Sequence, residues 1–479
     1  MTEPFTFVLY GATGDLAKRK IYPALFNLFL ENKLATPFHI IGLGRRELTN
    51  EQFRTNVEKS ILQFSRKQPQ DSNVFNTFLQ QFEYSVLDVG KQEDYKTLLE
   101  KVMNREREYN IPENRMFYLS VAPEFFDVIA QNIKESGLGD TKGWKKLIIE
   151  KPFGHDLKSA QSLNEKLSES FREEEVYRID HYLGKYMVQN IATLRFKNPL
   201  VESLWSNKYI SNIQITAAEI VGVEERASYF DKSGTIRDMI QNHMLQMLML
   251  VAMEPPTKGS NIRMEKVKAL KCIEPYDTNE VDKNVVRGQY GPGKMNGEFV
   301  VGYKEEPGVP KDSTNDTFVA AKFYIENERW AGVPVYIRSG KRMEKKQTKI
   351  VVEFKKPQGD KEGASPNLLI ININPGEGIT YKINSNNPNE HGEIETVHVD
   401  HVVNSTNVQE GYERLIHDAI LGNSDFFSAW EEVEYSWKLV EPMLHAFASN
   451  HAPLYTYAAG TDGPEEANML LKEDGFSWN

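Results

Sequence analysis

The chain has 479 residues, of which 40% are hydrophobic and 26% charged, so it is long enough to form two or three domains with sizeable cores. Its 57 Lys and Arg residues against 68 Asp and Glu residues give a formal net charge of −11, which argues against a nucleic-acid-binding or membrane-coating protein. The single cysteine, Cys272, excludes an intrachain disulfide, and Glu3 and Pro4 do not fit a secretory signal. These features predict a soluble, cytoplasmic, globular protein.

The first third of the chain shows strands that alternate with helices. Phe5 to Tyr10 is a short apolar run, residues 16–29 have the apolar spacing of an amphipathic helix, and residues 38–44 form a second apolar run. Further strand patterns follow at residues 115–123 and 145–154. Strands that alternate with helices build parallel sheets covered on both faces. Residues 1–179 are therefore predicted to form a doubly wound α/β domain.

From about Asp180 the pattern changes. Alternating apolar and polar residues, typical of antiparallel strands, occur at residues 211–222, 316–327, 333–340 and 348–355. A long helical pattern runs from Arg237 to Met253, and its most apolar part, from Met244, is too short to cross a bilayer. Residues 180–479 are predicted to form a larger α+β domain with a mainly antiparallel sheet.

A glycine-rich turn lies between the first predicted strand and the first predicted helix. Gly11 would allow a tight turn, Gly14 would let a pyrophosphate approach the backbone, and Ala17 would let the helix pack closely on the strand. Free N–H groups and the helix dipole favour an anion at such a turn. A glycine turn is also ordinary before a helix, but the strand–helix–strand context favours a Rossmann-type dinucleotide site.

The residues at the end of the second predicted strand indicate which dinucleotide would bind. Adjacent guanidinium groups at Arg45 and Arg46 suit a 2′-phosphate, which favours NADP, with NAD as the weaker alternative and a solvated charge pair as the other reading. Glu31 has the offset of a ribose-binding acid, but it precedes the second strand and is interpreted as the solvated end of a helix. Of Lys18, Arg19 and Lys20, two are expected to face solvent.

Several longer motifs then carry a resemblance to one family. They are GATGDLAKRK (11–20), EKPFGHDL (150–157), RIDHYLGK (178–185), VGVEERASYF (221–230), DMIQNHMLQ (238–246), QYGPG (289–293) and RWAGVPVYIRSGKRM (329–343). In order and spacing they resemble the glucose-6-phosphate dehydrogenases, from Phe5 to about Tyr457. The resemblance implies oxidation of D-glucose 6-phosphate at C1 to 6-phospho-D-glucono-1,5-lactone with hydride transfer to NADP, the first step of the oxidative pentose phosphate pathway.

The resemblance also implies catalytic roles for two residues. Oxidation at C1 requires a base that removes the hydroxyl proton while the hydride leaves, and His243 matches the family's base. A carboxylate on the other ring nitrogen would fix the tautomer and stabilise the imidazolium, and Asp180 matches that partner. Asp180 and His181 are expected to point to opposite sides of an extended segment, and so to have separate functions.

The remaining site residues are implied by matched positions. The substrate would be bound by Lys20, Lys151, His181, Tyr182, Lys185, Glu219, Asp238, Lys341 and Lys346. His181, Tyr182 and Lys185 would hold the phosphate. The cofactor would be bound by Gly11, Thr13, Gly14, Asp15, Leu16, Arg45, Arg46, Asp88, Val89, Ala122, Lys151 and Pro152, with Ser120 to Pro123 lining the cofactor cleft. Pro152 would have a cis peptide bond or act as a hinge.

One position departs from the family pattern: Tyr186 follows Lys185 where the family has glutamate. Loss of that anion would leave Lys185 freer for phosphate, or the ring would displace it; we expect retained chemistry with an altered substrate KM. No metal site is indicated, because His398 and His401 match no family site. The family associates through the antiparallel sheet, which implies a homodimer or, alternatively, a tetramer.

Two other functions fit the fold. A related Rossmann sugar oxidoreductase would act on free sugars, but His181 and Lys185 argue for a phosphorylated substrate. A non-catalytic NADP-sensing protein would lack the base or its partner, but His243 and Asp180 are both present.

Overall fold

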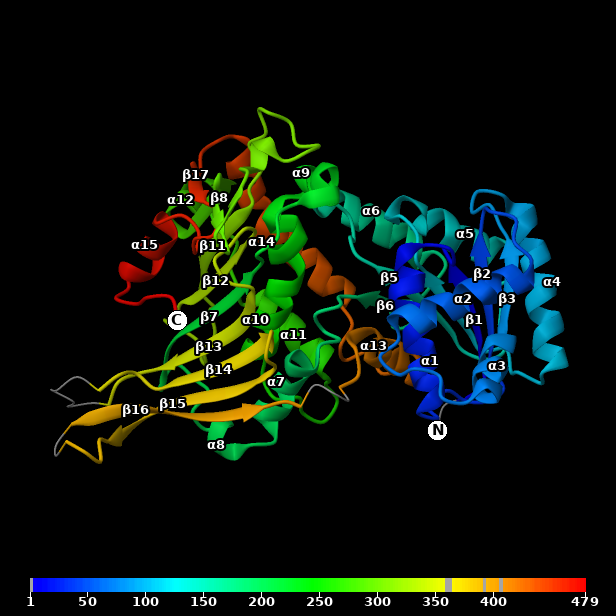
Figure 1. The fold of residues 1–479 in the computed structure, drawn as a ribbon, viewed down its shortest axis with the longest axis horizontal. Coiled ribbons are helices and arrows are strands. Elements are labelled where there is room, and N and C mark those ends of the chain that lie inside the picture. Colours follow the sequence, from blue (N-terminus) through cyan, green and yellow to red (C-terminus); the bar gives the residue numbers. More distant parts are fainter. Residues whose placement is uncertain (1–2, 358–363, 391–392, 405–407) are drawn as a thin grey trace. The chain divides into compact units, whose positions relative to one another are not determined.

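The computed structural model describes residues 3–357, 364–390, 393–404 and 408–479 (Figure 1). The chain divides into two compact units. The first consists of Met1–Gly184 and Gln409–Val433, and the second of Lys185–Val408 and Glu434–Asn479.

The described part of the first unit contains a six-stranded parallel sheet with the order β3-β2-β1-β4-β5-β6. The strands are β1 (Thr6–Tyr10), β2 (His39–Gly44), β3 (Phe82–Val86), β4 (Arg115–Leu119), β5 (Lys145–Glu150) and β6 (Val176–Ile179). This is the order of a doubly wound dinucleotide-binding fold. The four strands predicted from the sequence, β1, β2, β4 and β5, are confirmed.

Helices cover both faces of this sheet. They are α1 (Tyr22–Leu30), α2 (Asn50–Phe64), α3 (Ser72–Gln80), α4 (Gln92–Glu108), α5 (Phe126–Glu135), α6 (Leu157–Ser168) and α13 (Gly411–Leu421), with short segments η1 (Ala17–Ile21), η2 (Pro123–Phe125) and η3 (Glu173–Glu175). Successive strand residues face opposite sides, so Phe7 and Leu9 of β1 join one hydrophobic cluster and Val8 and Tyr10 join the other. Burial on both faces explains the uninterrupted apolar strands.

The segment Gln409–Val433 returns to the first unit, where α13 packs against α1. Leu415 and Ile416 are fully buried in the same cluster as α1. The Glu413 carboxylate, 1% exposed, accepts hydrogen bonds from Arg66 at 2.7 Å and from Asn27 at 2.9 Å. The prediction of one boundary at residue 179/180 did not include this return, since its contacts join residues more than 340 positions apart in sequence.

The interpretation of Glu31 as a solvated helix end is wrong. Glu31 does end α1, but its side chain is only 17% exposed and is paired with Arg66 at 2.5 Å and with Lys67 at 2.8 Å. Three cations, including Lys33, hold the pKa of this carboxyl well below its usual range. Lys67 and Arg66 lie in the segment after α2, which local sequence does not place beside α1.

The described residues of the second unit form a nine-stranded sheet with the order β16-β15-β14-β13-β7-β12-β11-β8-β17. Its strands are β7 (Ile210–Ala218), β8 (Val285–Gly291), β11 (Phe318–Phe323), β12 (Val335–Gly340), β13 (Gln347–Phe354), β14 (Leu368–Asn374), β15 (Gly378–Asn386), β16 (Ile394–Val402) and β17 (Leu454–Ala458). Two neighbouring pairs, β7/β12 and β8/β17, are parallel and the others antiparallel, so the predicted mainly antiparallel sheet is confirmed. β9 (Gly293–Met295) and β10 (Glu298–Val300) form a separate hairpin.

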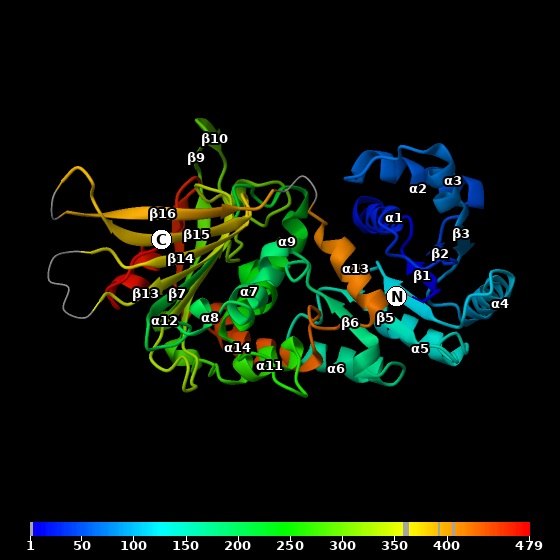
Figure 2. The same cartoon turned by 90° about the horizontal axis from the view of Figure 1, so that it is seen from below.

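In the second unit, α7 and α10 pack on each other. The helix α7 also contacts β14, and Figure 2 shows it beside the strands of the sheet. The helices are α7 (Tyr186–Phe196), α8 (Pro199–Glu202), α9 (Ala227–Thr235), η5 (Ile236–Met244), α10 (Leu245–Ala252), α11 (Ile262–Lys271), α12 (Val281–Asn284) and α15 (Glu466–Lys472), with short segments η4 (Glu224–Arg226), η6 (Thr278–Glu280) and η7 (Tyr303–Glu305). The helix α14 (Trp430–Ala448) begins in the last residues of the first unit and continues in the second. Among the helices that the structure describes, none combines the length and apolar character needed to cross a bilayer.

Candidate functional site

A cavity of about 380 Å³ lies at the carboxyl ends of β1, β2, β3 and β4. Its lining residues are Tyr10, Gly11, Thr13, Gly14, Leu43, Gly44, Arg45, Leu87, Asp88, Val89, Ser120, Val121, Ala122 and Phe125. In this sheet β1 lies between β2 and β4, the point at which the strand order reverses. Doubly wound folds bind dinucleotides at that point, outside the carboxyl ends of the strands.

The backbone after β1 fits a close approach by a dinucleotide. Gly11 has φ +78°, and a Cβ there would lie 2.0 Å from the carbonyl oxygen of Ser120. The N–H of Gly14 donates to the carbonyl of Gly11 at 2.9 Å, which closes the turn before the helix. A side chain at position 11 would therefore collide with the backbone after β4 and strain the turn, so the glycine present fits the cofactor that the sequence predicts.

Seven predicted cofactor residues line this cavity: Gly11, Thr13, Gly14, Arg45, Asp88, Val89 and Ala122. Asp15, Leu16, Arg46, Lys151 and Pro152 do not line it. The prediction missed Tyr10, Leu43, Gly44, Leu87 and Phe125, although three of these, Tyr10, Gly44 and Leu87, end or directly follow a strand. The rule that ligands sit beyond parallel strand ends could have found them.

The first two residues after β2, Arg45 and Arg46, are cations, and the first acid after them is Glu47. Arg45 and Arg46 are both exposed, and Arg45 alone of the two lines the cavity. The carbonyl of Arg46 accepts a hydrogen bond from the Tyr84 hydroxyl at 2.8 Å, which holds this backbone beside β3. A guanidinium at the mouth of a dinucleotide cavity suits a phosphate group rather than ribose hydroxyls.

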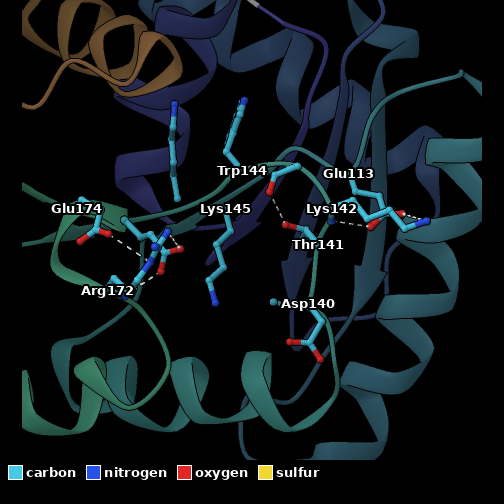
Figure 3. A pocket seen from close by; sticks show the side chains of 12 residues that line it. Glu113, Asp140, Thr141, Lys142, Trp144, Lys145, Arg172 and Glu174 are labelled. Carbon is cyan, nitrogen blue, oxygen red and sulfur yellow. Dashed lines mark hydrogen bonds and ion pairs between the residues drawn. The ribbon is translucent and has the colours of Figure 1, made fainter.

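A second cavity, of about 750 Å³, lies at the amino-terminal edge of the same sheet (Figure 3). Its cations already have partners within the described residues. Arg172 pairs with Glu174 and Glu175, the Lys145 ammonium donates to the carbonyl of Ser170, and the Lys146 ammonium donates to the carbonyls of Ala419 and Ile420 at the end of α13. These groups hold the unit together, and we assign no ligand to this cavity.

The RIDHYLGK motif forms a turn, not the extended segment that was expected. β6 ends at Ile179, and the carbonyl of Asp180 accepts from the N–H of Leu183 at 3.0 Å. The Asp180 carboxylate, 2% exposed, accepts from the N–H of Tyr182 at 2.9 Å. Aspartate favours such a turn because its side chain bonds the backbone two residues on. His181 is exposed, and its ring lies 5.1 Å from that of Tyr182.

Two of the predicted substrate lysines, Lys20 and Lys151, belong to the first unit. Lys20 pairs with Glu410 at 2.9 Å, whereas Lys18 is exposed and the exposed Arg19 pairs with Asp15. The expectation that two of these three cations face solvent is confirmed. The Lys151–Pro152 peptide is cis, one of the two predicted alternatives.

In the second unit, Asp238 and His243 lie in η5, a π-helical segment. A π-helix bonds residue i to i+5, so these two residues stand about one turn apart. Asp238 is 6% and His243 1% exposed, and the N–H of His243 donates to the Asn242 side-chain oxygen at 2.7 Å. Asp238 lies 3.7 Å from Arg226, which the sequence did not single out. Short π-helical segments are frequent at functional sites.

Glu219 and Lys341 meet at the carboxyl ends of the parallel strands β7 and β12. Ala218 is paired with Gly340, so the residues that follow these two, Glu219 and Lys341, lie side by side. The Lys341 ammonium donates to the Glu219 carboxylate at 2.5 Å and lies 4.8 Å from the centre of the Phe230 ring. Lys341 is 8% exposed, whereas Lys346 is exposed. Lys185 and Tyr186, at the start of α7, are partly buried.

The structure thus groups the predicted residues within each unit. The first contains the cavity residues, Lys20, Lys151, Asp180, His181 and Tyr182; the second contains Lys185, Glu219, Asp238, His243, Lys341 and Lys346. The pairing of Asp180 with His243 joins residues of different units and stays a prediction.

Comparisons with known proteins agree with this arrangement. Residues 8–190 match the glucose-6-phosphate dehydrogenase NAD binding domain, and residues 192–479 match the C-terminal domain of the same family. A glucose-6-phosphate 1-dehydrogenase of Bacillus subtilis is 47% identical, with 98% of this chain and 97% of that protein covered. Among solved structures, a glucose-6-phosphate dehydrogenase in complex with its substrate glucose-6-phosphate has a TM-score of 0.92 and 36% identity, covering 100% of this chain and 99% of that one. A glucose-6-phosphate 1-dehydrogenase from Mycobacterium avium has a TM-score of 0.83 and 31% identity, with 100% and 99% covered.

Proposed function

Because the chain belongs to the glucose-6-phosphate dehydrogenase family, we propose that it oxidises D-glucose 6-phosphate at C1 to 6-phospho-D-glucono-1,5-lactone, with NADP as the oxidant. The observation that carries the proposal is the glycine-lined cavity at the strand-order reversal of the first unit, in a chain that also has the family's base and sugar-binding positions. The chain is accordingly an oxidoreductase that uses a nicotinamide cofactor; the residue roles below are part of the proposal.

His243 is the general base of the proposed reaction. As neutral imidazole it accepts the C1 hydroxyl proton, and Asp180 stabilises the cation that forms. Burial of His243 within η5 keeps its ring from free rotation in water, and the turn bond between the Asp180 carboxylate and the Tyr182 N–H fixes the carboxylate. A buried base and a carboxylate that is fixed by a backbone N–H need little reorganisation when charge develops.

The substrate is positioned by charged groups of both signs. His181, Tyr182 and Lys185 hold the phosphate, and Lys20, Lys151 and Lys346 add positive charge for anionic ligands. Glu219 and Asp238 accept hydrogen bonds from sugar hydroxyls. The ion pair with Lys341 holds the Glu219 carboxylate in one place, so an analogue that lacks the matching hydroxyl would leave a charge without its partner.

The nicotinamide cofactor proposed for this chain is NADP rather than NAD. When bound, NADP accepts the hydride from C1. Gly11, Thr13 and Gly14 would hold the pyrophosphate, Arg45 and Arg46 the 2′-phosphate, and Asp88, Val89 and Ala122 would line the cleft, with Asp15, Leu16, Lys151 and Pro152 at its margins. The support for NADP over NAD is the cation at the cavity mouth and the lack of an acid between the end of β2 and Glu47.

A homodimer, through the sheet of the second unit, completes the proposal. Its support is a set of large apolar side chains exposed along the last two strands: Ile383 (41%), Ile394 (52%), Val399 (53%) and Val402 (73%). Because β16 ends the sheet among the described residues, a second copy on one face of these strands would cover either Ile383 and Val399 or Ile394 and Val402. A cytoplasmic location is also proposed, because the one cysteine needs no oxidising compartment.

Initial rates with four substrate–cofactor combinations test the proposed function. The expected order is glucose 6-phosphate with NADP, then glucose 6-phosphate with NAD, with free glucose far slower in either case. Equal kcat/KM for glucose and glucose 6-phosphate would favour a sugar oxidoreductase of different specificity. Binding of NADP without turnover of any sugar would favour the non-catalytic alternative.

A further inference from the structure

Glu150, the last residue of β5, is a carboxyl group that the proposed reaction does not use. The Tyr118 hydroxyl of β4 donates to its Oε1 at 2.6 Å, and the Tyr412 hydroxyl of α13 lies 3.5 Å from its Oε2. Tyr118 is fully buried. Two phenols from separate elements therefore hold one partly buried carboxyl group.

This carboxyl group lies among predicted site residues of the same unit. It directly precedes Lys151, and Glu150 is paired with Ile179, so Asp180 lies one residue beyond the end of the neighbouring strand. The start of α13 also reaches the Asp180 turn, because a Cβ at Gly184 would lie 2.6 Å from the carbonyl oxygen of Gly411. Burial raises the pKa of the Tyr412 hydroxyl, and the charges of Glu150 and Asp180 raise it further.

We propose that Glu150 is a positioning residue whose carboxyl group, held by Tyr118 and Tyr412, sets the net charge around Lys151 and Asp180 and thereby the affinity for anionic ligands. The proposal rests on the proposed function for the roles of Lys151 and Asp180. The role proposed for Glu150 is indirect, because it acts through the charges of Lys151 and Asp180.

The charge of this carboxyl group changes within the working pH range. Burial raises the pKa of Glu150 to about 7, the Tyr118 and Tyr412 hydroxyls and the Lys151 charge oppose that rise, and the Asp180 charge adds to it. Below that pH the acid is neutral; above it, the proton passes to solvent water and a carboxylate remains. The carboxylate would offset the positive charge of Lys151, so we expect weaker binding of anionic ligands at higher pH.

The first test compares wild type with Glu150→Gln between about pH 6 and about pH 8.5, by KM for glucose 6-phosphate and by fluorescence titration of NADPH. Gln keeps the shape of the neutral acid. The ratio of wild-type to variant KM or Kd should be smallest at low pH and rise roughly tenfold with a midpoint near the pKa of Glu150, the effect of one neighbouring charge. A ratio cancels the titration of the substrate phosphate.

The second test uses Tyr118→Phe and infrared difference spectra. Loss of the phenol that donates to the carboxylate should move the midpoint of the KM and Kd changes to higher pH. The carbonyl band of a protonated acid should titrate with the same midpoint and be absent in Glu150→Gln. A merely structural role would lower stability but would not move a midpoint.

The outcomes separate the inference from the proposed function. A pH-independent ratio, or an infrared band that does not change in Glu150→Gln, would overturn the role of Glu150. Absence of glucose 6-phosphate turnover in wild type would overturn the proposed function, and the NADPH titration would still decide the inference. If Glu150→Gln did not fold, the midpoint shift in Tyr118→Phe would decide it.

Discussion

The two units use parallel strand ends in different ways. In the first, the carboxyl ends of β1 to β4 surround a cavity whose lining combines three glycines with polar, aliphatic and aromatic side chains. In the second, the carboxyl ends of β7 and β12 hold an ion pair, Glu219 with Lys341, and no comparable void lies between those two side chains. A large cofactor thus needs a space that side chains leave open, with backbone groups exposed to it. A small polar substrate instead needs charged side chains that are held in position before it binds.

The first variant removes the proposed general base in the second unit. His243→Asn removes the proposed base but keeps a polar side chain of related shape, so kcat should fall roughly 10²- to 10⁴-fold. Steady-state kinetics and the Kd for glucose 6-phosphate check this. A near-normal kcat would remove His243 from the mechanism.

The second variant changes the glycine turn at the cavity of the first unit. Gly11→Ala places a methyl group against the Ser120 carbonyl at a backbone conformation with φ +78°. We expect NADPH binding to weaken roughly 10- to 100-fold, the cost of a non-glycine residue held in that region. Gly297→Ala serves as the control, because it also has positive φ but nothing lies within 4 Å of its Cβ position. Equal loss of NADPH binding in both variants would contradict a specific role for Gly11.

The third variant tests the preformed charges of the second unit. Lys341→Met keeps the length of the side chain but leaves Glu219 without its ammonium partner. KM for glucose 6-phosphate should rise roughly 10- to 100-fold, as for the loss of a charge-assisted hydrogen bond, while the Kd for NADPH stays close to that of wild type. If the NADPH affinity fell as much as KM rose, Lys341 would not be specific to the sugar.

The fourth and smallest effect sharpens the cofactor assignment. Arg45→Ala should raise KM for NADP roughly tenfold and leave KM for NAD nearly unchanged. Arg172→Ala, an exposed arginine at the cavity on the opposite edge of the same sheet, is the matched control and should change neither constant. A parallel loss for NADP and NAD would show that Arg45 does not select the 2′-phosphate.

The sequence predicted most of what local pattern determines. The apolar runs of β1, β2, β4 and β5 and the glycine turn follow from short-range rules, and their positions are confirmed. The Asp180 turn was missed because strand periodicity says nothing about an aspartate that bonds the backbone two residues later. The π-helical η5 was missed because its apolar spacing resembles that of an α-helix over nine residues.

Contacts between distant segments could not be predicted. The Glu413–Arg66 pair joins residues 347 positions apart, and the Lys341–Glu219 pair joins residues 122 positions apart. Nothing in the local sequence of either partner selects the other, so Glu31 was interpreted as solvated and the return of α13 to the first unit was not foreseen. Tyr186 starts α7 and is partly buried; the structure gives no reason for its replacement of glutamate.

The first unit is proposed to bind the cofactor and the second to supply the base. Fluorescence titration of NADPH into His243→Asn and Gly11→Ala tests this division most directly. We expect His243→Asn to bind NADPH within about twofold of wild type and Gly11→Ala to bind it at least roughly tenfold more weakly. Weakened binding in His243→Asn, or unchanged binding in Gly11→Ala, would contradict this division between the units.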